Sequence, residues 1–197
     1  MNSKMLFFDT ETTGLHPGNI CQLSYIITDN DDVQAKNFFF TVDYVEPGAK
    51  RVHGLSVEKL RKLSNNKRFK DYFNEIKNDF DSVDIIAGHN VSFDIKFIKA
   101  EFSNCNYSYD YKESLCTMKD FTSICQITKS NGKGYKWPKL EELTNFFEVK
   151  HNDIVKASHE LFKMQGIGFH DARYDIAATY LCYSKAEKSG LLGQLAF

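Results

Sequence analysis

An apolar run that ends in two carboxylates constrains this chain more than any other feature of its sequence. Residues 5–8 are apolar and are typical of a buried strand, and Asp9 and Glu11 follow them directly. Side chains alternate between the two faces of a strand, so we expect Asp9 and Glu11 to point the same way. Two carboxylates at the end of a buried strand repel each other and resist desolvation. A bound divalent cation would relieve both effects.

Two further segments combine acids with histidine. Residues 89–94 read His-Asn-Val-Ser-Phe-Asp, and residues 170–175 read His-Asp-Ala-Arg-Tyr-Asp. Hard divalent cations prefer oxygen ligands, which Asp94 and Asp175 would add to the first two acids. The three segments are therefore expected to converge on metal ions.

Composition is consistent with one enzyme-sized domain over residues 1–197. The chain is 42% hydrophobic, with 17 Phe and 10 Tyr, which is enough material for a substantial core. Because 25 basic residues stand against 26 acidic ones, any contact with nucleic acid must be local. Basic patches occur at residues 50–51, 61–62, 67–68 and 129–139. Each of them is also explained as a solvated surface.

Neither a membrane segment nor a disulfide framework is expected. The first strand begins within a few residues of Met1, and no apolar run approaches the length of a membrane span. The five cysteines include no C-x-x-C pair, so we expect reduced core residues. The protein is therefore expected to be cytoplasmic.

The hydrophobic patterns predict an α/β fold with a mixed sheet. The predicted strands cover residues 5–9, 20–28, 34–43, 84–88 and 114–118, and the first three are expected to form an antiparallel meander. The predicted helices cover residues 56–63, 69–80, 92–102, 139–147, 153–164 and 172–188. Ligands of such sheets gather at strand ends, where residues 9–11 and 88–90 lie.

The three segments closely resemble the three motifs of the DnaQ-like 3′→5′ exonucleases of the DEDDh type. Asp9 and Glu11 match the first motif, Asp94 the second, and His170 with Asp175 the third. Residues 52–55, Val-His-Gly-Leu, look like a further element of that family, and the likeness extends over residues 5–183. It implies an RNase H-like fold with a five-stranded sheet, two Mg²⁺ or Mn²⁺ ions, and release of nucleoside 5′-monophosphates from a 3′ end.

Roles for the catalytic residues follow from two-metal chemistry. Asp9 is expected to bridge both ions, Glu11 and Asp175 to complete one site, and Asp94 to hold the other. His170 is then the general base, since an unperturbed histidine pKa of about 6.5 suits that role. His151 and His159 are interpreted as surface residues. Asp171 is assigned to solvent or to orienting its loop, and His89 to shaping a turn.

Substrate contacts are predicted around the first motif. Backbone N–H groups of Thr12, Thr13 and Gly14 are expected to approach the terminal nucleotide, and Leu15 to wedge beneath its base. The alternative for Gly14 is a turn after the strand, and the alternative for Leu15 is packing in the core. His53 and Asn90 are further candidates for contact with substrate. Residues 132–139 interleave cations and aromatic rings, a composition that could hold a single strand by charge and stacking. Trp137 is interpreted as packing the start of a helix, and the role of the lysines is left open.

The predicted activity is metal-dependent removal of nucleotides from a single-stranded or frayed 3′ end of DNA, in proofreading or repair and with a polymerase as a candidate partner. RNA trimming is one alternative, because no residue decides what meets a 2′-hydroxyl. A silent binding module is another. The segment 150–169 is longer than the family pattern, and Gly166 to Gly168 would form a flexible joint that lets His170 close on the substrate.

Overall fold

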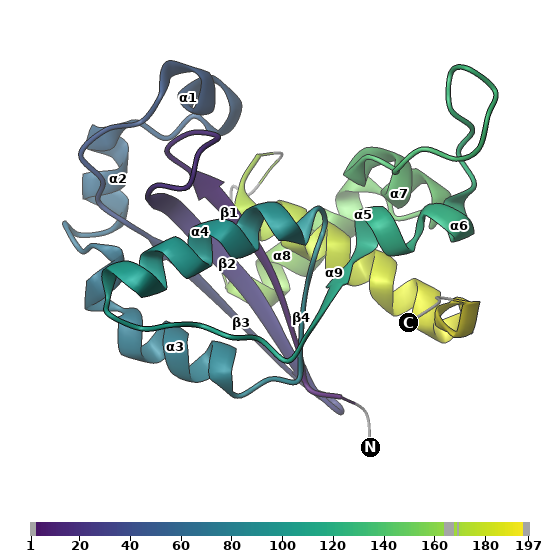
Figure 1. The fold of residues 1–197 in the computed structure, drawn as a ribbon, viewed down its shortest axis with the longest axis horizontal. Coiled ribbons are helices and arrows are strands. Elements are labelled where there is room, and N and C mark those ends of the chain that lie inside the picture. The colour runs from purple at the N-terminus through teal and green to yellow at the C-terminus, as the bar shows by residue number, and fades with distance from the viewer. Residues whose placement is uncertain (1–2, 164–167, 169, 195–197) are drawn as a thin grey trace.

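The computed structural model describes residues 3–163, 168 and 170–194 (Figure 1). Its centre is a five-stranded sheet with the strand order β3-β2-β1-β4-β5. The strands are β1 (Met5–Thr12), β2 (Ile20–Asp29), β3 (Asp32–Phe39), β4 (Ile85–Gly88) and β5 (Glu113–Cys116). The first three are antiparallel, and β4 is parallel to both β1 and β5. The predicted mixed sheet and its meander are confirmed.

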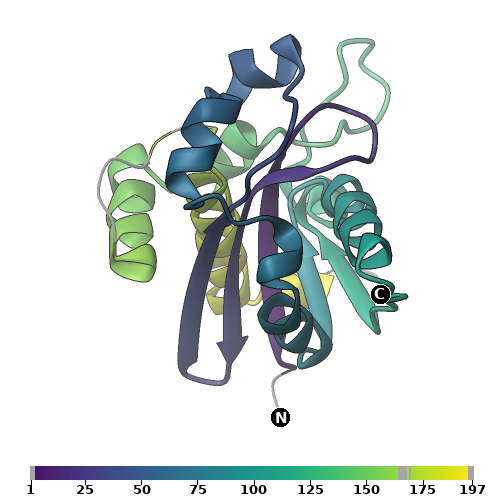
Figure 2. The same ribbon diagram turned by 90° about the vertical axis from the view of Figure 1, so that its left-hand side faces the viewer.

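Helices cover both faces of the sheet, in front of and behind its strands in the view of Figure 2. One face carries α7 (Leu140–Phe146), α8 (His151–Phe162) and α9 (Ala172–Lys188), and the other carries α3 (Phe73–Asp81) and α4 (Val91–Asn104). The pair α1 (Pro47–His53) and α2 (Val57–Leu63) lies beyond one end of the sheet. Short turns complete the fold: η1 (Phe69–Asp71), α5 (Thr117–Asp120), α6 (Thr122–Cys125) and η2 (Leu191–Gln194). No helix within the described residues is long and apolar enough to cross a membrane.

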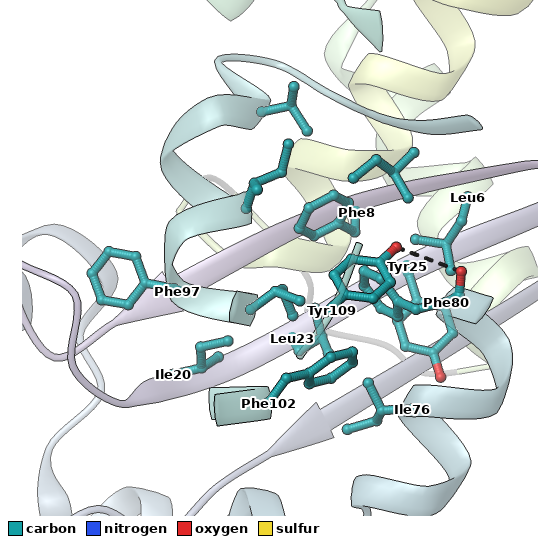
Figure 3. Close-up of a cluster of buried hydrophobic side chains, with 14 of the residues drawn as sticks. Leu6, Phe8, Ile20, Leu23, Tyr25, Ile76, Phe80, Phe97, Phe102 and Tyr109 are labelled. Atoms are coloured by element: carbon teal, nitrogen blue, oxygen red, sulfur yellow. Dashed lines mark hydrogen bonds between the residues drawn. The ribbon is translucent and has the colours of Figure 1, made fainter. Parts of the chain in front are cut away.

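Strand β1 divides the core into two clusters because its side chains alternate between faces. Phe7 packs toward α9, with its ring 5.0 Å from that of Tyr183. Phe8 packs toward α3 and α4, with its ring 5.2 Å from that of Phe80. Figure 3 shows this second cluster, where the hydroxyl of Tyr109 donates to the Phe80 carbonyl at 3.5 Å. Continuing the alternation, Asp9 and Glu11 emerge on the α9 side and Thr10 on the α4 side.

Two predicted elements are divided or end differently in the structure, and one helix was not predicted. Residues 69–80 do not form one helix, because Asp71 accepts a bond from the Arg68 N–H and closes the separate turn η1 before α3 begins. Strand β5 stops at Cys116, whose N–H donates to Asp120 of α5, so Met118 is helical. Helix α1 was not predicted at all, although Pro47 at its start and Gly54 at its end are ordinary helix boundary signals. The predicted end of α8 at Met164 lies outside the described residues.

All five cysteines are free thiols. Cys21, Cys116, Cys125 and Cys182 are buried in the core as predicted, and Cys105 is half-buried.

Candidate active site

Three carboxylates converge where β1 ends. One oxygen atom from each of Asp9, Glu11 and Asp175 can be chosen so that all three lie within 4.8 Å of one another. Asp9 and Glu11 share the α9 side of β1, as the alternation predicts. Asp175 belongs to the first turn of α9, which is capped by the side chain of Asp171. An anion in that position is favoured by the helix dipole.

Asp94 reaches the same point from the other side of β1. Its Oδ1 accepts hydrogen bonds from the N–H of Thr10 at 3.1 Å and from the Thr10 hydroxyl at 2.6 Å. Asp94 is buried in the first turn of α4, and β1 separates it from Glu11 and Asp175. Asp94, Asp175 and Glu11 all act electrostatically on Asp9, so Asp9 is near each of the other three acids.

Burial raises the pKa of all four acids, and repulsion from neighbouring carboxylates adds to the effect for Asp9, Glu11 and Asp175. The pKa of Asp9 is raised well above its usual range, first by burial and then by Asp94, Asp175 and Glu11. Burial, with Asp175 as the largest charge effect, raises the pKa of Glu11 to about 9. Burial also raises the pKa of Asp94 and of Asp175 to about 7. Without a cation, these groups would hold protons at neutral pH.

The residues present fit divalent cations. The donor set consists only of carboxylate oxygens, which suits Mg²⁺ or Mn²⁺. A cation would also offset the repulsion that helps to raise the pKa of Asp9, Glu11 and Asp175. Within the described residues, this is the one group of histidine, cysteine and acid side chains close enough to hold an ion.

A cleft of about 1170 Å³ opens beside the acids toward α7 and α8. It is lined by Asp9, Asp175 and His170, together with residues of α7, α8 and the turn after β4. His170 is exposed and has φ of 57°, a left-handed conformation two residues before the first residue of α9. Its imidazole is thus accessible within the same cleft as two of the acids. The proposed joint at Gly166 to Gly168 falls largely outside the described residues.

His151 also lines this cleft, although the sequence was interpreted as placing it on an ordinary surface. Its Nδ1 lies 2.8 Å from the hydroxyl of Tyr174, the residue before Asp175. The approach is possible because α8 packs against α9, an arrangement that the sequence spacing does not reveal. His159 lies further along α8 and does not line the cleft, and its buried Nε2 has no hydrogen-bond partner.

A network that sequence reasoning missed holds the start of α9. Asp171 accepts bonds from the side chain of Arg173, with Nε at 2.8 Å and Nη2 at 2.5 Å, and from the Gln22 amide at 2.9 Å. Burial opposes ionisation of Asp171, but the hydrogen bonds and charge of Arg173, together with the hydrogen bond from Gln22, outweigh it and lower the pKa of this carboxyl. The network joins β2 to the turn that carries His170 and Asp175. Asp171 therefore orients its loop and is not a solvent-exposed acid.

The loop after β1 is held by its own hydrogen bonds. The Thr12 hydroxyl donates to the Gly14 carbonyl at 2.8 Å. The Thr13 N–H donates to the Asn19 carbonyl at 3.0 Å, so this predicted contact with the nucleotide has its donor already engaged. A Cβ on Gly14 would come within 2.2 Å of a Glu46 carboxylate oxygen. Because these atoms are the flexible end of an exposed side chain, a larger residue at position 14 would only have to displace the Glu46 carboxylate.

Leu15 and His53 flank that loop. Leu15 is 79% exposed, which excludes the alternative that it packs in the core. His53 accepts from the Leu55 N–H through Nδ1, at 3.0 Å, so its Nε2 carries the proton and donates to the Thr12 carbonyl at 3.2 Å. Burial lowers the pKa of His53, which suits this neutral form. In this structure His53 supports the β1–β2 loop.

The turn after β4 ties several segments together. The Nδ1 of His89 lies 3.0 Å from the Thr117 hydroxyl, and the ring also bonds the Pro138 carbonyl. Burial lowers the pKa of His89 to about 4. These contacts agree with a structural role for this residue. Asn90 is exposed in a left-handed conformation, with φ of 65°, just before α4.

Trp137 does not pack the start of α7, contrary to the sequence interpretation. Its side chain is 59% exposed, whereas the neighbouring Pro138 is buried. The buried proline takes the packing position before α7 and leaves the indole ring at the surface.

Comparison with known proteins identifies the family. The model of the exonuclease family represented by RNase T matches residues 6–183. The DNA polymerase III subunit epsilon of Buchnera aphidicola subsp. Schizaphis graminum is 29% identical over 163 residues, which cover 77% of this chain and 66% of that protein. The same subunit of Rickettsia felis is 37% identical over 112 residues, covering 50% of this chain and 44% of the relative. The chain thus spans about half to two thirds of these relatives.

Solved structures share the fold. E. coli exonuclease I in complex with a dA16 oligonucleotide has a TM-score of 0.68 and 23% identity over 95% of this chain and 41% of that one. A product-bound exonuclease I has a TM-score of 0.70 and 21% identity, covering 95% and 44%. The RNase H-like architecture is therefore confirmed. By the match to its family model, this chain belongs to the exonuclease family, and the DnaQ-like assignment made from its three motifs is confirmed.

Proposed function

We propose that residues 1–197 form a single metal-dependent exonuclease domain, which removes nucleoside 5′-monophosphates from a single-stranded or frayed 3′ end of DNA. The observation that carries this proposal is the convergence of Asp9, Glu11 and Asp175 beside the exposed imidazole of His170. DNA as the substrate is supported by the similarity to the epsilon subunit of DNA polymerase III. It is also supported by the shared fold with exonuclease I, which was solved in complex with a dA16 oligonucleotide.

Each acid would have a distinct task in holding two Mg²⁺ or Mn²⁺ ions. Asp9 would be shared by both ions, Glu11 and Asp175 would bind one, and Asp94 would bind the other through the oxygen that Thr10 does not use. When bound, the ions would supply activation of water and neutralisation of charge on the phosphate. His170 would accept the proton from the attacking water, because its ring is accessible in the cleft.

The elements around the acids would position the terminal nucleotide. Leu15 projects from the β1–β2 loop and would contact the terminal base. His53 holds that loop through Thr12, and the network of Asp171, Arg173 and Gln22 holds the turn that carries the base. Such support keeps reacting groups aligned without itself touching the phosphate.

The test is a time course on matched DNA and RNA oligomers labelled at the 3′ or the 5′ end, with Mg²⁺, with Mn²⁺ or with chelator. We expect stepwise shortening of 5′-labelled DNA, immediate release of the 3′ label, and no reaction with chelator. Asp9→Asn should be inactive in every condition. Cutting of a closed single-stranded circle, turnover in excess chelator, or faster trimming of RNA than of DNA would each contradict the proposal.

Proofreading or repair is the proposed setting. The relatives that are named polymerase subunits support an association with a DNA polymerase. A 3′-terminal mismatch should then be removed faster than a paired terminus in the same duplex, since an unpaired end needs no melting. Equal rates on the two ends would argue against an editing role.

A further inference from the structure

The segment between α6 and α7 forms a defined hairpin. The Lys136 N–H donates to the Ile127 carbonyl at 2.8 Å, and the Lys129 N–H donates to the Gly134 carbonyl at 3.0 Å. Thr128 and Tyr135 pair as an antiparallel bridge. In Figures 1 and 2 this hairpin rises from the end of the sheet at which the β1–β2 loop also lies.

The hairpin presents two aromatic rings to solvent. Tyr135 is 44% exposed and Trp137 is 59% exposed. They are two positions apart, the spacing that would place both rings on one side of an extended segment. Lys136, between them, is paired with Glu142 of α7, and Lys119 lies 5.7 Å from the centre of the Trp137 ring. Large exposed rings that are bordered by cations mark an interaction surface.

The charge of the hairpin favours a polyanion. Residues 126–139 contain four lysines and no acid, although the whole chain has a net charge of −1. Within the described part of the chain, no salt bridge involves Lys129, Lys133 or Lys139. Their charge is therefore available to phosphates, while the rings are available to bases.

The base of the hairpin is joined to the active-site cleft. The Pro138 carbonyl accepts a bond from His89, and the ring of His89 lines the same cleft as Asp9. Leu140 and Glu141, just after the hairpin, line it too. A strand whose terminal nucleotide lies at the acids can thus leave over His89 toward Trp137.

We propose that residues 127–137 bind the part of a single strand that lies 5′ to the terminal nucleotide, with Trp137 and Tyr135 stacking on its bases and Lys129 and Lys133 contacting its phosphates. The inference deepens the proposed function and rests on it for the position of the 3′ end. Stacking of this kind tolerates any sequence, because every base has a flat face.

Trp137 is the one tryptophan of the chain, so intrinsic tryptophan fluorescence reports on this position alone. With excess chelator, a (dT)12 oligomer should quench the fluorescence saturably, and the dinucleotide (dT)2 should quench it weakly. In kinetics, Trp137→Ala should raise KM for (dT)12 by roughly 5- to 100-fold, the range given by losing one stacked base. The rate on (dT)2 should stay unchanged, and Trp137→Phe should restore most of the affinity for (dT)12.

Replacing Lys129 and Lys133 with glutamine should lower the slope of log KM against log salt concentration by about 0.7 for each phosphate that no longer meets a lysine. An absence of quenching by (dT)12 would overturn the inference and would point to a protein partner for the hairpin. An equal loss of activity on (dT)12 and on (dT)2 in Trp137→Ala would also overturn the inference. If the unmutated protein hydrolyses neither substrate, the proposed function fails, and the quenching measurement still decides whether the hairpin binds a strand.

Discussion

Asp94 of α4 is fixed to the middle of the first motif by Thr10, whose N–H and hydroxyl both donate to the same carboxylate oxygen. Thr10 lies between Asp9 and Glu11 but faces the opposite side of β1. One strand thereby aims two acids at one face and holds a third on the other. The second carboxylate oxygen of Asp94 takes no part in these two bonds.

Thr10→Val should lower metal affinity or turnover by about 10- to 100-fold, the usual effect of losing a hydrogen bond that orients a metal ligand. Valine keeps the shape and burial of threonine but removes the 2.6 Å hydroxyl bond to Asp94. Titration of turnover with Mn²⁺ measures the effect. Thr10→Ser retains the hydroxyl and should behave close to the unmutated protein. A normal Mn²⁺ titration in Thr10→Val would mean that this bond does not orient Asp94.

Asp175→Asn should stabilise the metal-free protein while abolishing activity. Burial raises the pKa of Glu11, Asp94 and Asp175 above their ordinary values, and neighbouring acids add to the effect for Glu11 and Asp175. The native state then holds more protons than the unfolded state, so the free energy of unfolding falls as pH rises from about 5 to 8. The slope is about 1.4 kcal/mol per pH unit for each extra proton held. Asp175→Asn removes one of these charges, so the free energy of unfolding should fall less steeply with pH.

Urea unfolding in chelator at several pH values measures the slope, and addition of Mg²⁺ should reverse the loss in the unmutated protein. Asp31→Asn, at an exposed turn between β2 and β3, is the matched control and should change nothing. A free energy of unfolding that rises with pH in chelator would contradict the proposed repulsion.

The sequence allowed prediction of the five strands and the acids because those features are local. Alternation along β1 places Asp9 and Glu11 on one face, and the motif spacing adds Asp94, Asp175 and His170. Contacts between distant segments were not predictable in this way. The bond of Gln22 to Asp171 joins residues 149 positions apart. The place of His151 in the cleft depends on how α8 packs against α9, and no periodicity encodes that.

Exposure of single side chains was the weakest part of the sequence interpretation. Trp137 and Pro138 are adjacent and both apolar, and only the structure shows that the proline is buried and the indole is not. The same holds for Leu15, for which core packing and projection into solvent were both compatible with the sequence.

His170→Ala should reduce turnover by about 10²- to 10⁴-fold, as expected for loss of a general base. Stabilisation of the fold by Mg²⁺ should remain near that of the unmutated protein, because His170 is not one of the acids that converge at β1. His151→Ala is the matched comparison, since His151 lines the same cleft. It should lose far less turnover. If His151→Ala is the variant that loses activity, the base has been assigned to the wrong histidine.

Leu15→Ala should weaken binding of the terminal nucleotide. Leu15 is 79% exposed on the loop after β1, so its truncation leaves no core cavity. We expect KM for single-stranded DNA to rise by roughly fivefold, with unchanged thermal stability. Leu63→Ala is the control, because Leu63 is 45% exposed at the end of α2 and no role is proposed for it. Equal KM values for the two variants would remove Leu15 from the substrate site.

The contacts of His89 should make part of the stability depend on pH. Burial lowers the pKa of His89 to about 4, below its ordinary value near 6.5, so the unfolded state binds the proton first. His89 therefore contributes stability at pH 7, and this contribution is lost as pH falls from about 6.5 to 4, by up to about 1.4 kcal/mol per pH unit. The four acids act in the opposite sense over this range, so the unmutated protein alone does not isolate the effect.

The difference between the unmutated protein and His89→Asn does isolate it, because the acids are common to both. Urea unfolding in chelator should show the unmutated protein more stable at pH 7, with the gap closing toward pH 4.5. Asparagine cannot reach both the Thr117 hydroxyl and the Pro138 carbonyl, so the base of the hairpin should loosen as well. A gap that stays constant with pH would show that His89 is not held neutral by the turn after β4.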